Sequence, residues 1–260
     1  MRLPAIVATD LDGTLLRSDG LPSRRTVDAL VSATARGARV IAVTGRPPRW
    51  VADIDERFGV GTLVVCMNGA LVIDLESGEE LAHAPFAAGV AADLAAAIRD
   101  ALPAVVFAVQ DRGAFGHEPG YVPLHETPGD REAPVAELAA GTVTKLIVKH
   151  EGIGHDELVT IARAAVRGRA EVTFSGGRIV ELSAPGVHKA YGLAIAAGLL
   201  GLDPADSVAF GDAPNDIEML RAAGHGVAMA NAHDAVLAVA DEVTVSNEDD
   251  GVAVLLERLL

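Results

Sequence analysis

The chain has 260 residues, half of them apolar and only 3% aromatic, so aliphatic side chains must fill a sizeable core. The formal net charge is −15, from 36 acidic and 21 basic residues without a Lys/Arg cluster, which argues against binding to nucleic acid or to anionic lipid. No apolar stretch reaches the roughly 20 residues that a membrane-spanning helix needs.

The start of the sequence, MRLPAIVATDLDG, meets an aspartate too early for the apolar core of a secretory signal. The single cysteine, Cys66, has no second cysteine to pair with, and we expect it to be a small buried strand residue. We therefore expect a cytoplasmic protein. The pattern does not indicate an oligomeric state.

Strand-like and helix-like segments alternate from the start of the chain. The segments are PAIVAT, a helix that begins at Ser23 and closes at Gly37, ARVIAVTG, a helix PRWVADIDERFG and TLVVCM. This alternation predicts parallel strands joined by helices. The next stretch, NGALVIDLESGEELAHAP, predicts a hairpin.

The pattern changes after residue 83. We expect a helix near 87–102, a strand AVVFAVQD, a long Gly/Pro-rich loop over 111–134, a strand TVTKLIVKH, a helix over about 156–167 and two strands, AEVTFSG and RIVELSA. Loops of that length are usually functional or mobile. His117, Tyr121 and His125 lie in it, either as specificity residues that face an active site or as part of a mobile surface loop.

Regular alternation resumes near residue 185, with a helix HKAYGLAIAAGLLG, a strand SVAFGD, a helix DIEMLRAAG, a strand GVAMA and a terminal helix. The sequence therefore predicts an α/β fold whose doubly wound, parallel, Rossmann-like core comprises residues 1–83 and 185–260. An α+β cap domain over 84–184 is inserted in it.

Polar residues suited to one reaction follow several of the predicted core strands. Active sites of doubly wound sheets lie beyond the carboxyl ends of the strands, so residues at these ends are expected to meet. They are Asp10 and Asp12 after the first strand, Thr44, Gly45 and Arg46 after the second, and Asp212, Asn215 and Asp216 after SVAFGD, with Lys189 at the start of the preceding helix.

Three carboxylates in one crevice would repel one another, and Mg²⁺, which prefers oxygen ligands and substrate phosphate, would relieve that repulsion. A carboxylate can also attack phosphorus to form an aspartyl-phosphate. The metal, Lys189 and the Thr44 hydroxyl could together neutralise a phosphate dianion. Of the paired aspartates, one would be the nucleophile and the other would carry the proton.

The motifs DLDGT, VTGR, a lone lysine in HKAYGL and GDAPND resemble, in order, the four motifs of the haloacid dehalogenase-like (HAD) phosphatases. NGA at 68–70, GVAMANA and SNEDDGVA are similar to the Cof-type subfamily (IIB), which carries a large α/β cap between the second and third motifs. The resemblance covers both core pieces, whereas the cap matches mainly by size and position.

This resemblance implies that Asp10 is the nucleophile and Asp12 the general acid and base. It implies that Mg²⁺ is held by the Asp10 carboxylate, the Asp12 carbonyl oxygen and Asp212, and that Asp216 supports the metal or positions Lys189. The phosphoryl group is expected to contact Thr44, Gly45, Lys189 and Asn215, although Asn215 could instead organise its loop. Arg46 and Asn68 either touch substrate or are turn and surface residues.

The sequence thus predicts a Mg²⁺-dependent phosphomonoester hydrolase that acts on a small phosphorylated metabolite. The related subfamilies suggest a sugar phosphate, and nucleotides, flavin phosphates and pyridoxal phosphate stay open as substrates. Two alternatives remain open at this point. A phosphomutase would use the same aspartate pair and would isomerise its substrate without releasing phosphate. A non-catalytic module would bind a phosphometabolite without turning it over, although such a module has little need for a proton carrier.

Overall fold

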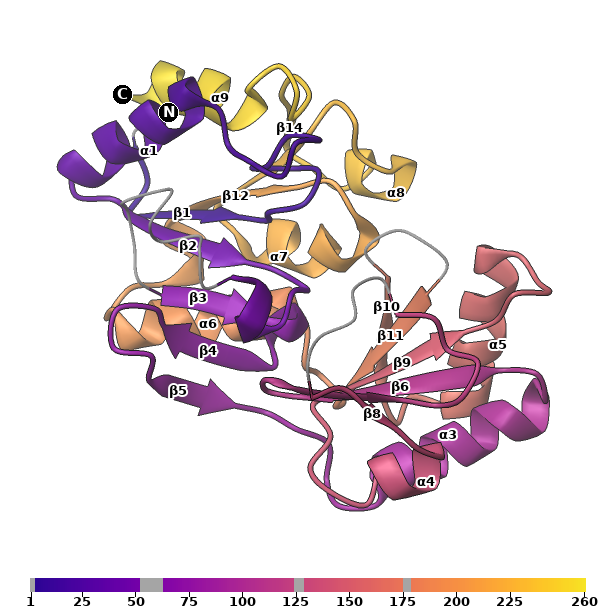
Figure 1. Ribbon diagram of the computed structural model, residues 1–260. Coiled ribbons are helices and arrows are strands. Elements are labelled where there is room, and N and C mark those ends of the chain that lie inside the picture. The colour runs from indigo at the N-terminus through magenta and orange to yellow at the C-terminus, as the bar shows by residue number, and fades with distance from the viewer. Residues whose placement is uncertain (1–2, 52–62, 124–128, 175–178) are drawn as a thin grey trace. The chain divides into compact units, whose positions relative to one another are not determined.

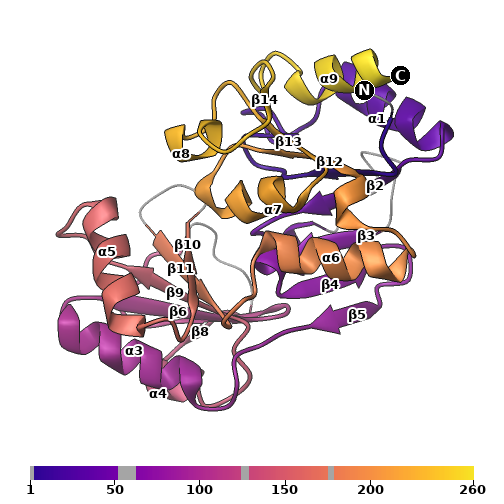
Figure 2. The same cartoon turned by 180° about the vertical axis from the view of Figure 1, so that it is seen from behind.

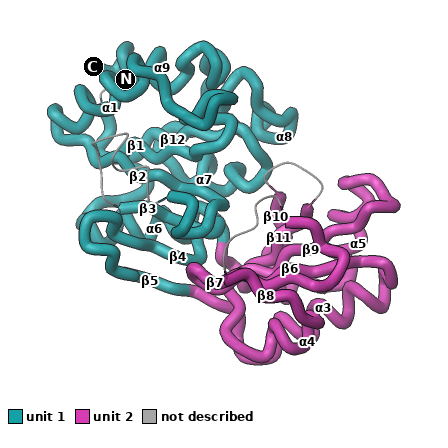
Figure 3. Tube along the Cα trace, viewed as in Figure 1, with its two compact units in different colours: residues 1–83, 188–260 teal, residues 84–187 magenta. Residues whose placement is uncertain are grey.

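The computed structural model describes residues 3–51, 63–123, 129–174 and 179–260. The chain divides into two compact units, here called unit 1 (Met1–His83 and His188–Leu260) and unit 2 (Ala84–Val187) (Figure 3). The second division lies at 187/188, a few residues after the boundary at 184/185 that the sequence suggested. Each unit has its own sheet.

The described part of unit 1 contains an eight-stranded sheet in the order β14-β13-β12-β1-β2-β3-β4-β5. The strands from β14 to β3 are parallel, and β4 and β5 form the antiparallel hairpin that the sequence predicted. The strand bounds are β1 Ile6–Thr9, β2 Arg39–Val43, β3 Leu63–Cys66, β4 Leu71–Asp74, β5 Glu80–His83, β12 Ser207–Gly211, β13 His225–Ala228 and β14 Glu242–Val243.

Helices cover both faces of this sheet, as a doubly wound fold requires. Helices α6 (Lys189–Leu199) and α7 (Ile217–Ala222) pack together on one face, and α1 (Arg24–Ala35) and α9 (Gly251–Leu259) pack together on the other (Figure 1, Figure 2). Shorter helical turns are η1 Pro48–Trp50, η2 Met67–Gly69, η3 Pro204–Asp206, η4 Pro214–Asp216 and α8 Asp234–Leu237.

The central strand β1 shows why the apolar runs of the sequence become buried strands. Ile6 and Ala8 point into a cluster with the α6 and α7 side chains, whereas Val7 alternates to the other face, and all three are fully buried. Ser23 caps α1 by accepting a hydrogen bond from the Thr26 amide, as expected of a serine at that position. The predicted α/β fold class is therefore confirmed.

The described part of unit 2 forms a second, largely antiparallel sheet in the order β10-β11-β9-β6-β7-β8. Helices α3 and α5 contact each other, and α5 contacts β10 and β11. The bounds are α3 Val90–Ala101, β6 Val106–Asp111, β7 Ala114–His117, β8 Arg131–Glu132, α4 Val135–Leu138, β9 Lys145–Lys149, α5 His155–Val166, β10 Glu171–Thr173 and β11 Ile179–Ser183.

The prediction of one long loop over 111–134 was wrong, because β7 and β8 lie within it. Tyr121 is also buried, packed with Ala108 and Ile147, so the surface-loop alternative does not hold for this residue. His125 lies outside the described residues. The predicted helix after Arg46 lies outside them too, except for the turn Pro48–Trp50.

Two further sequence predictions concern single features of the chain. Cys66 ends β3 and is fully buried, as expected of a small strand residue. Across the residues that the structure describes, no helix has the length and apolar character needed to cross a membrane.

The loop after β3 contacts the first turn of α6 through Gly69. Its φ of +100° is strained for other residues, and a Cβ there would lie 2.0 Å from the His188 carbonyl oxygen. We expect Gly69→Ala to lower the free energy of unfolding by about 2 kcal/mol or more, or roughly 4 to 8 °C in Tm. Thermal unfolding measures this change.

Gly78→Ala is the matched control, because Gly78 also has a positive φ, of +70°, but a Cβ added there would have no atom within 4 Å. The Gly78→Ala variant should lose only the stability that the strained backbone conformation removes. Equal losses in the two variants would show that contact between the loop and α6 is not what makes Gly69 necessary.

Candidate active site

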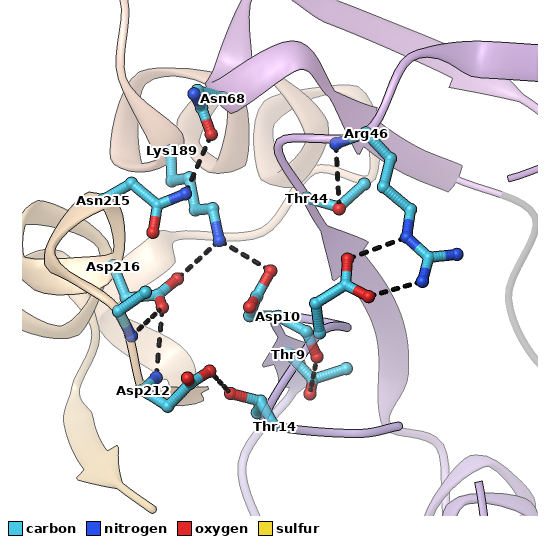
Figure 4. Close-up of polar contacts among 12 residues, drawn as sticks. Thr9, Asp10, Thr14, Thr44, Arg46, Asn68, Lys189, Asp212, Asn215 and Asp216 are labelled. Atoms are coloured by element: carbon cyan, nitrogen blue, oxygen red, sulfur yellow. Dashed lines mark hydrogen bonds and ion pairs between the residues drawn. The ribbon is translucent and has the colours of Figure 1, made fainter. Parts of the chain in front are cut away.

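The carboxyl ends of β1, β2 and β12 meet at one edge of the unit 1 sheet. β1 lies between the other two, parallel to both. The ten residues predicted for the site lie at this edge, where hydrogen bonds, ion pairs and close approaches join them in several sets, and Figure 4 labels all of them but Asp12 and Gly45. They are Asp10, Asp12, Thr44, Gly45, Arg46, Asn68, Lys189, Asp212, Asn215 and Asp216.

Lys189 bridges two carboxylates at the centre of the network. Its Nζ lies 2.6 Å from Asp10 Oδ1 and 2.6 Å from Asp216 Oδ1. The Lys189 and Asp216 side chains are fully buried, and Asp10 is nearly so. The attraction in a buried ion pair repays the cost of removing its charges from water only where its geometry is good and its other polar atoms are also hydrogen-bonded. The positions of these three side chains, here called the triad, are therefore closely constrained.

Asp216 is held on its other side by backbone amides. Its Oδ2 accepts hydrogen bonds from the Asp212 and Ala213 N–H groups, at 3.1 and 3.0 Å. Asp212 in turn accepts a hydrogen bond from the Thr14 hydroxyl at 2.6 Å. The residues that follow β12 are thereby fixed against those that follow β1.

Asp12 and Arg46 form a two-pronged ion pair beside this triad. Arg46 donates from Nε to Asp12 Oδ2 at 2.7 Å and from Nη2 to Asp12 Oδ1 at 2.5 Å. The hydrogen bond with Asp12 raises the pKa of Arg46 more than its partial burial lowers it. The pairing places the Arg46 side chain against Asp12, whereas the sequence left open contact with substrate or a turn or surface position.

Thr44, Asn68 and Asn215 line a second part of the edge. The Thr44 hydroxyl accepts from the Arg46 amide at 3.1 Å and can still donate its own proton. Asn215 Nδ2 donates to Asn68 Oδ1 at 3.0 Å. A Cβ on Gly45 would lie 2.9 Å from Asn68 Oδ1, so the backbone of Gly45 passes close to these two amides.

Sequence reasoning missed three residues that hold this arrangement. Thr14 stands in DLDGT, but no role was predicted for it, because its partner Asp212 lies far along the chain. Asn231 donates to the Gly13 carbonyl oxygen, and Asn247 donates to that of Leu16, so both fasten the loop after Asp12. The signal for them was only their place in GVAMANA and SNEDDGVA.

Burial and neighbouring charges shift the pKa values of Asp10, Asp212 and Lys189. Burial raises the pKa of Asp10 well above its usual value, and the Lys189 ammonium opposes that rise. Burial also raises the pKa of Asp212 to about 6, against the hydrogen bond from Thr14. Burial disfavours the charged form of Lys189, but Asp10 and Asp216 outweigh it and raise its pKa.

The acidic cluster fits a hard divalent cation. One carboxylate oxygen from each of Asp10, Asp212 and Asp216 lies within 4.8 Å of the others. Such oxygens are the ligands that Mg²⁺ and similar ions prefer, and a bound cation would offset the repulsion that helps to raise the pKa of Asp10 and Asp212.

The raised pKa of Asp212 predicts a pH-dependent stability. Its proton is held more tightly in the folded chain than in the unfolded one, so its contribution is fully present below a pH of about 3.9 and is lost as the pH rises through about 6. In Asp212→Asn this side chain cannot ionise, so the variant should not lose stability in this way as the pH rises. With a chelator present, the Tm gain of the variant over wild type should be larger at about pH 7.5 than at about pH 5. A gain that is equal at both pH values, measured by thermal unfolding, would contradict the assignment.

Comparison with known proteins places this geometry in context. A family model described as haloacid dehalogenase-like hydrolase matches residues 7–256. The chain is 30% identical over 275 residues to 5-amino-6-(5-phospho-D-ribitylamino)uracil phosphatase YitU of Bacillus subtilis, covering 98% of this chain and 97% of that protein. It is 30% identical over 264 residues to pyridoxal phosphate phosphatase YbhA of Escherichia coli, covering 95% and 96%. The solved structure of the HAD subclass IIB sugar phosphatase BT4131 shares the fold, with a TM-score of 0.83 at 21% identity over 97% and 98% of the two chains.

Proposed function

Because the chain belongs to the haloacid dehalogenase-like hydrolase family, among its Cof-type phosphatases, we propose that it is a Mg²⁺-dependent phosphomonoester hydrolase that works through an aspartyl-phosphate. The observation that carries this proposal is the buried Lys189, 2.6 Å from Asp10 at the carboxyl end of the central strand. In this arrangement an otherwise unfavourable buried carboxylate is kept close to a fixed positive charge.

Asp10 and Asp212 are the side chains that would hold the metal, together with the Asp12 carbonyl oxygen. Both oxygens of Asp216 are engaged, by Lys189 and by two backbone amides, so we assign Asp216 to positioning Lys189. When bound, the metal would supply positive charge that screens the substrate phosphate from the carboxylates.

Asp10 is the proposed nucleophile. Lys189 holds its Oδ1, which leaves Oδ2 to attack phosphorus. The new bond joins Asp10 Oδ2 to phosphorus while the bond from phosphorus to the ester oxygen breaks. Asp12 gives its proton to the departing oxygen, and the product alcohol leaves.

The second half of the cycle uses the same groups in reverse. Asp12, now a carboxylate, takes a proton from water as the water oxygen attacks phosphorus. The bond between Asp10 and phosphorus breaks, and inorganic phosphate is released. In a phosphomutase, a substrate hydroxyl would take the place of this water.

The phosphoryl group is proposed to contact Lys189, the Thr44 hydroxyl and the backbone at Gly45. These groups would stabilise the charge that develops on its oxygens. Asn215 and Asn68 hold each other beside Gly45, so we assign them to shaping this part of the site.

The substrate is proposed to be a small phosphorylated metabolite, with unit 2 as the cap that determines which one. The relatives YitU and YbhA are named for a ribityl phosphate and for pyridoxal phosphate, and BT4131 is named a sugar phosphatase. A sugar or sugar-like phosphate is therefore our first candidate. Location in the cytoplasm remains a prediction from the sequence.

The test is phosphate release from a panel of sugar, nucleotide and cofactor phosphates, each with Mg²⁺ and with chelator. We expect release from some of the esters that stops in chelator. Isomerised substrate without phosphate would favour the mutase, and tight binding without conversion would favour the non-catalytic module. Either result would refute the hydrolase.

A further inference from the structure

Asp12 and Arg46 are joined by two side-chain hydrogen bonds in a parallel arrangement, which a surface ion pair does not require. Both carboxylate oxygens of Asp12 accept from the guanidinium, one from Nε and one from Nη2. This parallel geometry fixes the plane and direction of a carboxylate, which a lysine ammonium cannot do.

Arg46 is itself anchored at three further points. Its Nη1 donates to the Trp50 carbonyl oxygen at 3.3 Å, and its backbone amide donates to the Thr44 hydroxyl. Its carbonyl oxygen accepts from the Met67 amide at 3.0 Å. The Arg46 backbone is therefore held by the segments that follow β2 and β3, and the guanidinium is held against Asp12 by Trp50.

Stability does not account for this arrangement. The Asp12 side chain is 57% exposed and that of Arg46 is 26% exposed, and ion pairs with such exposure contribute little to folding. An aspartate that is more than half exposed would otherwise move among several rotamers. Proton transfer, in contrast, requires its oxygen within hydrogen-bond reach of the reacting oxygen.

We infer that Arg46 is a positioning residue that orients Asp12 for proton transfer. The inference rests on the proposed function and extends it to a residue that does not itself react. During the transfer, the oxygen of Asp12 that carries the proton turns from its N–H donor toward the ester oxygen, while the other oxygen stays on the guanidinium. The proton moves to the ester oxygen as its bond to phosphorus breaks, and Asp12 returns to the two-pronged pair as a carboxylate.

The dependence of the rate on the leaving group tests this inference. A nitrophenolate leaves without help from an acid, whereas an alkoxide needs the proton of Asp12. We expect Arg46→Met to lower kcat/KM for an alkyl phosphate monoester by about 10- to 100-fold and that for nitrophenyl phosphate by less than about threefold. Arg46→Lys should not restore the wild-type kcat/KM for the alkyl ester. Neither variant should shift the Tm by more than about 3 °C.

Asp12→Asn is the reference variant, and the pair supplies a double-mutant cycle. If Arg46 acts through Asp12, adding Arg46→Met to Asp12→Asn should lower kcat/KM for the alkyl ester no further. Equal losses for both esters in Arg46→Met, full activity with the alkyl ester, or additive losses in the double variant would overturn the inference. Wild type that releases phosphate from no ester would instead refute the proposed function itself.

Discussion

Replacing Asp10 with asparagine is expected to abolish phosphate release, by about a thousand-fold or more, while the protein stays folded. An amide cannot attack phosphorus as a carboxylate does, so the aspartyl-phosphate cannot form. The fold should tolerate the change because asparagine has the same shape, and because it removes a carboxylate whose pKa burial has already raised. Phosphate release and thermal unfolding of the variant measure the two effects.

Asp28→Asn is the matched control for this experiment. Asp28 lies on α1, where it forms an exposed pair with Arg24, so its loss should change neither turnover nor Tm appreciably. Substantial turnover by Asp10→Asn would rule out Asp10 as the nucleophile. A large fall in its Tm would show that the residue is needed for folding instead.

Lys189→Met is expected to damage both stability and activity. The variant leaves Asp10 and Asp216 buried without the ammonium that lies 2.6 Å from each. Removing one partner of a buried ion pair typically costs about 3 to 5 kcal/mol, which is roughly 6 to 20 °C in Tm for a protein of this size. Loss of a group that stabilises the phosphoryl charge should lower kcat by about a hundred-fold or more.

Mg²⁺ provides a second readout for this variant. A divalent cation held by Asp10 and Asp212 would replace part of the positive charge lost beside Asp10, so Mg²⁺ should raise the Tm of Lys189→Met more than that of wild type. Arg25→Met serves as the control, because the pair of Arg25 and Glu257 is exposed and should contribute little. A Tm of Lys189→Met equal to that of wild type in chelator would contradict the role of the triad.

The fold of unit 1 was largely predictable because its strands are continuous apolar runs that end in polar residues. The run that ends at Asp10 and the run that ends at Asp212 became neighbouring parallel strands. Parallel strands place their carboxyl ends at one edge, so the candidate site residues could be grouped before any contact was known.

The parts that could not be predicted depend on partners distant in sequence. β7 and β8 are short strands in a Gly/Pro-rich segment. They are strands because β7 pairs with β6 and β8 pairs with β7, and their local sequence pattern does not indicate this pairing. The pair of Asp12 and Arg46 is similar, since neither motif indicates that its charged residue points toward the other. The position of a residue in the loop after a strand does not determine the direction in which its side chain points.

The most direct test of the proposed mechanism is to quench the enzyme with acid during its first turnover of a substrate in Mg²⁺ and to map its peptides by mass spectrometry. The mechanism predicts the added mass of one phosphoryl group on the peptide that contains Asp10, and its absence from the Asp10→Asn variant. A phosphoryl group on another side chain, or complete turnover with no labelled peptide at any quench time, would contradict it.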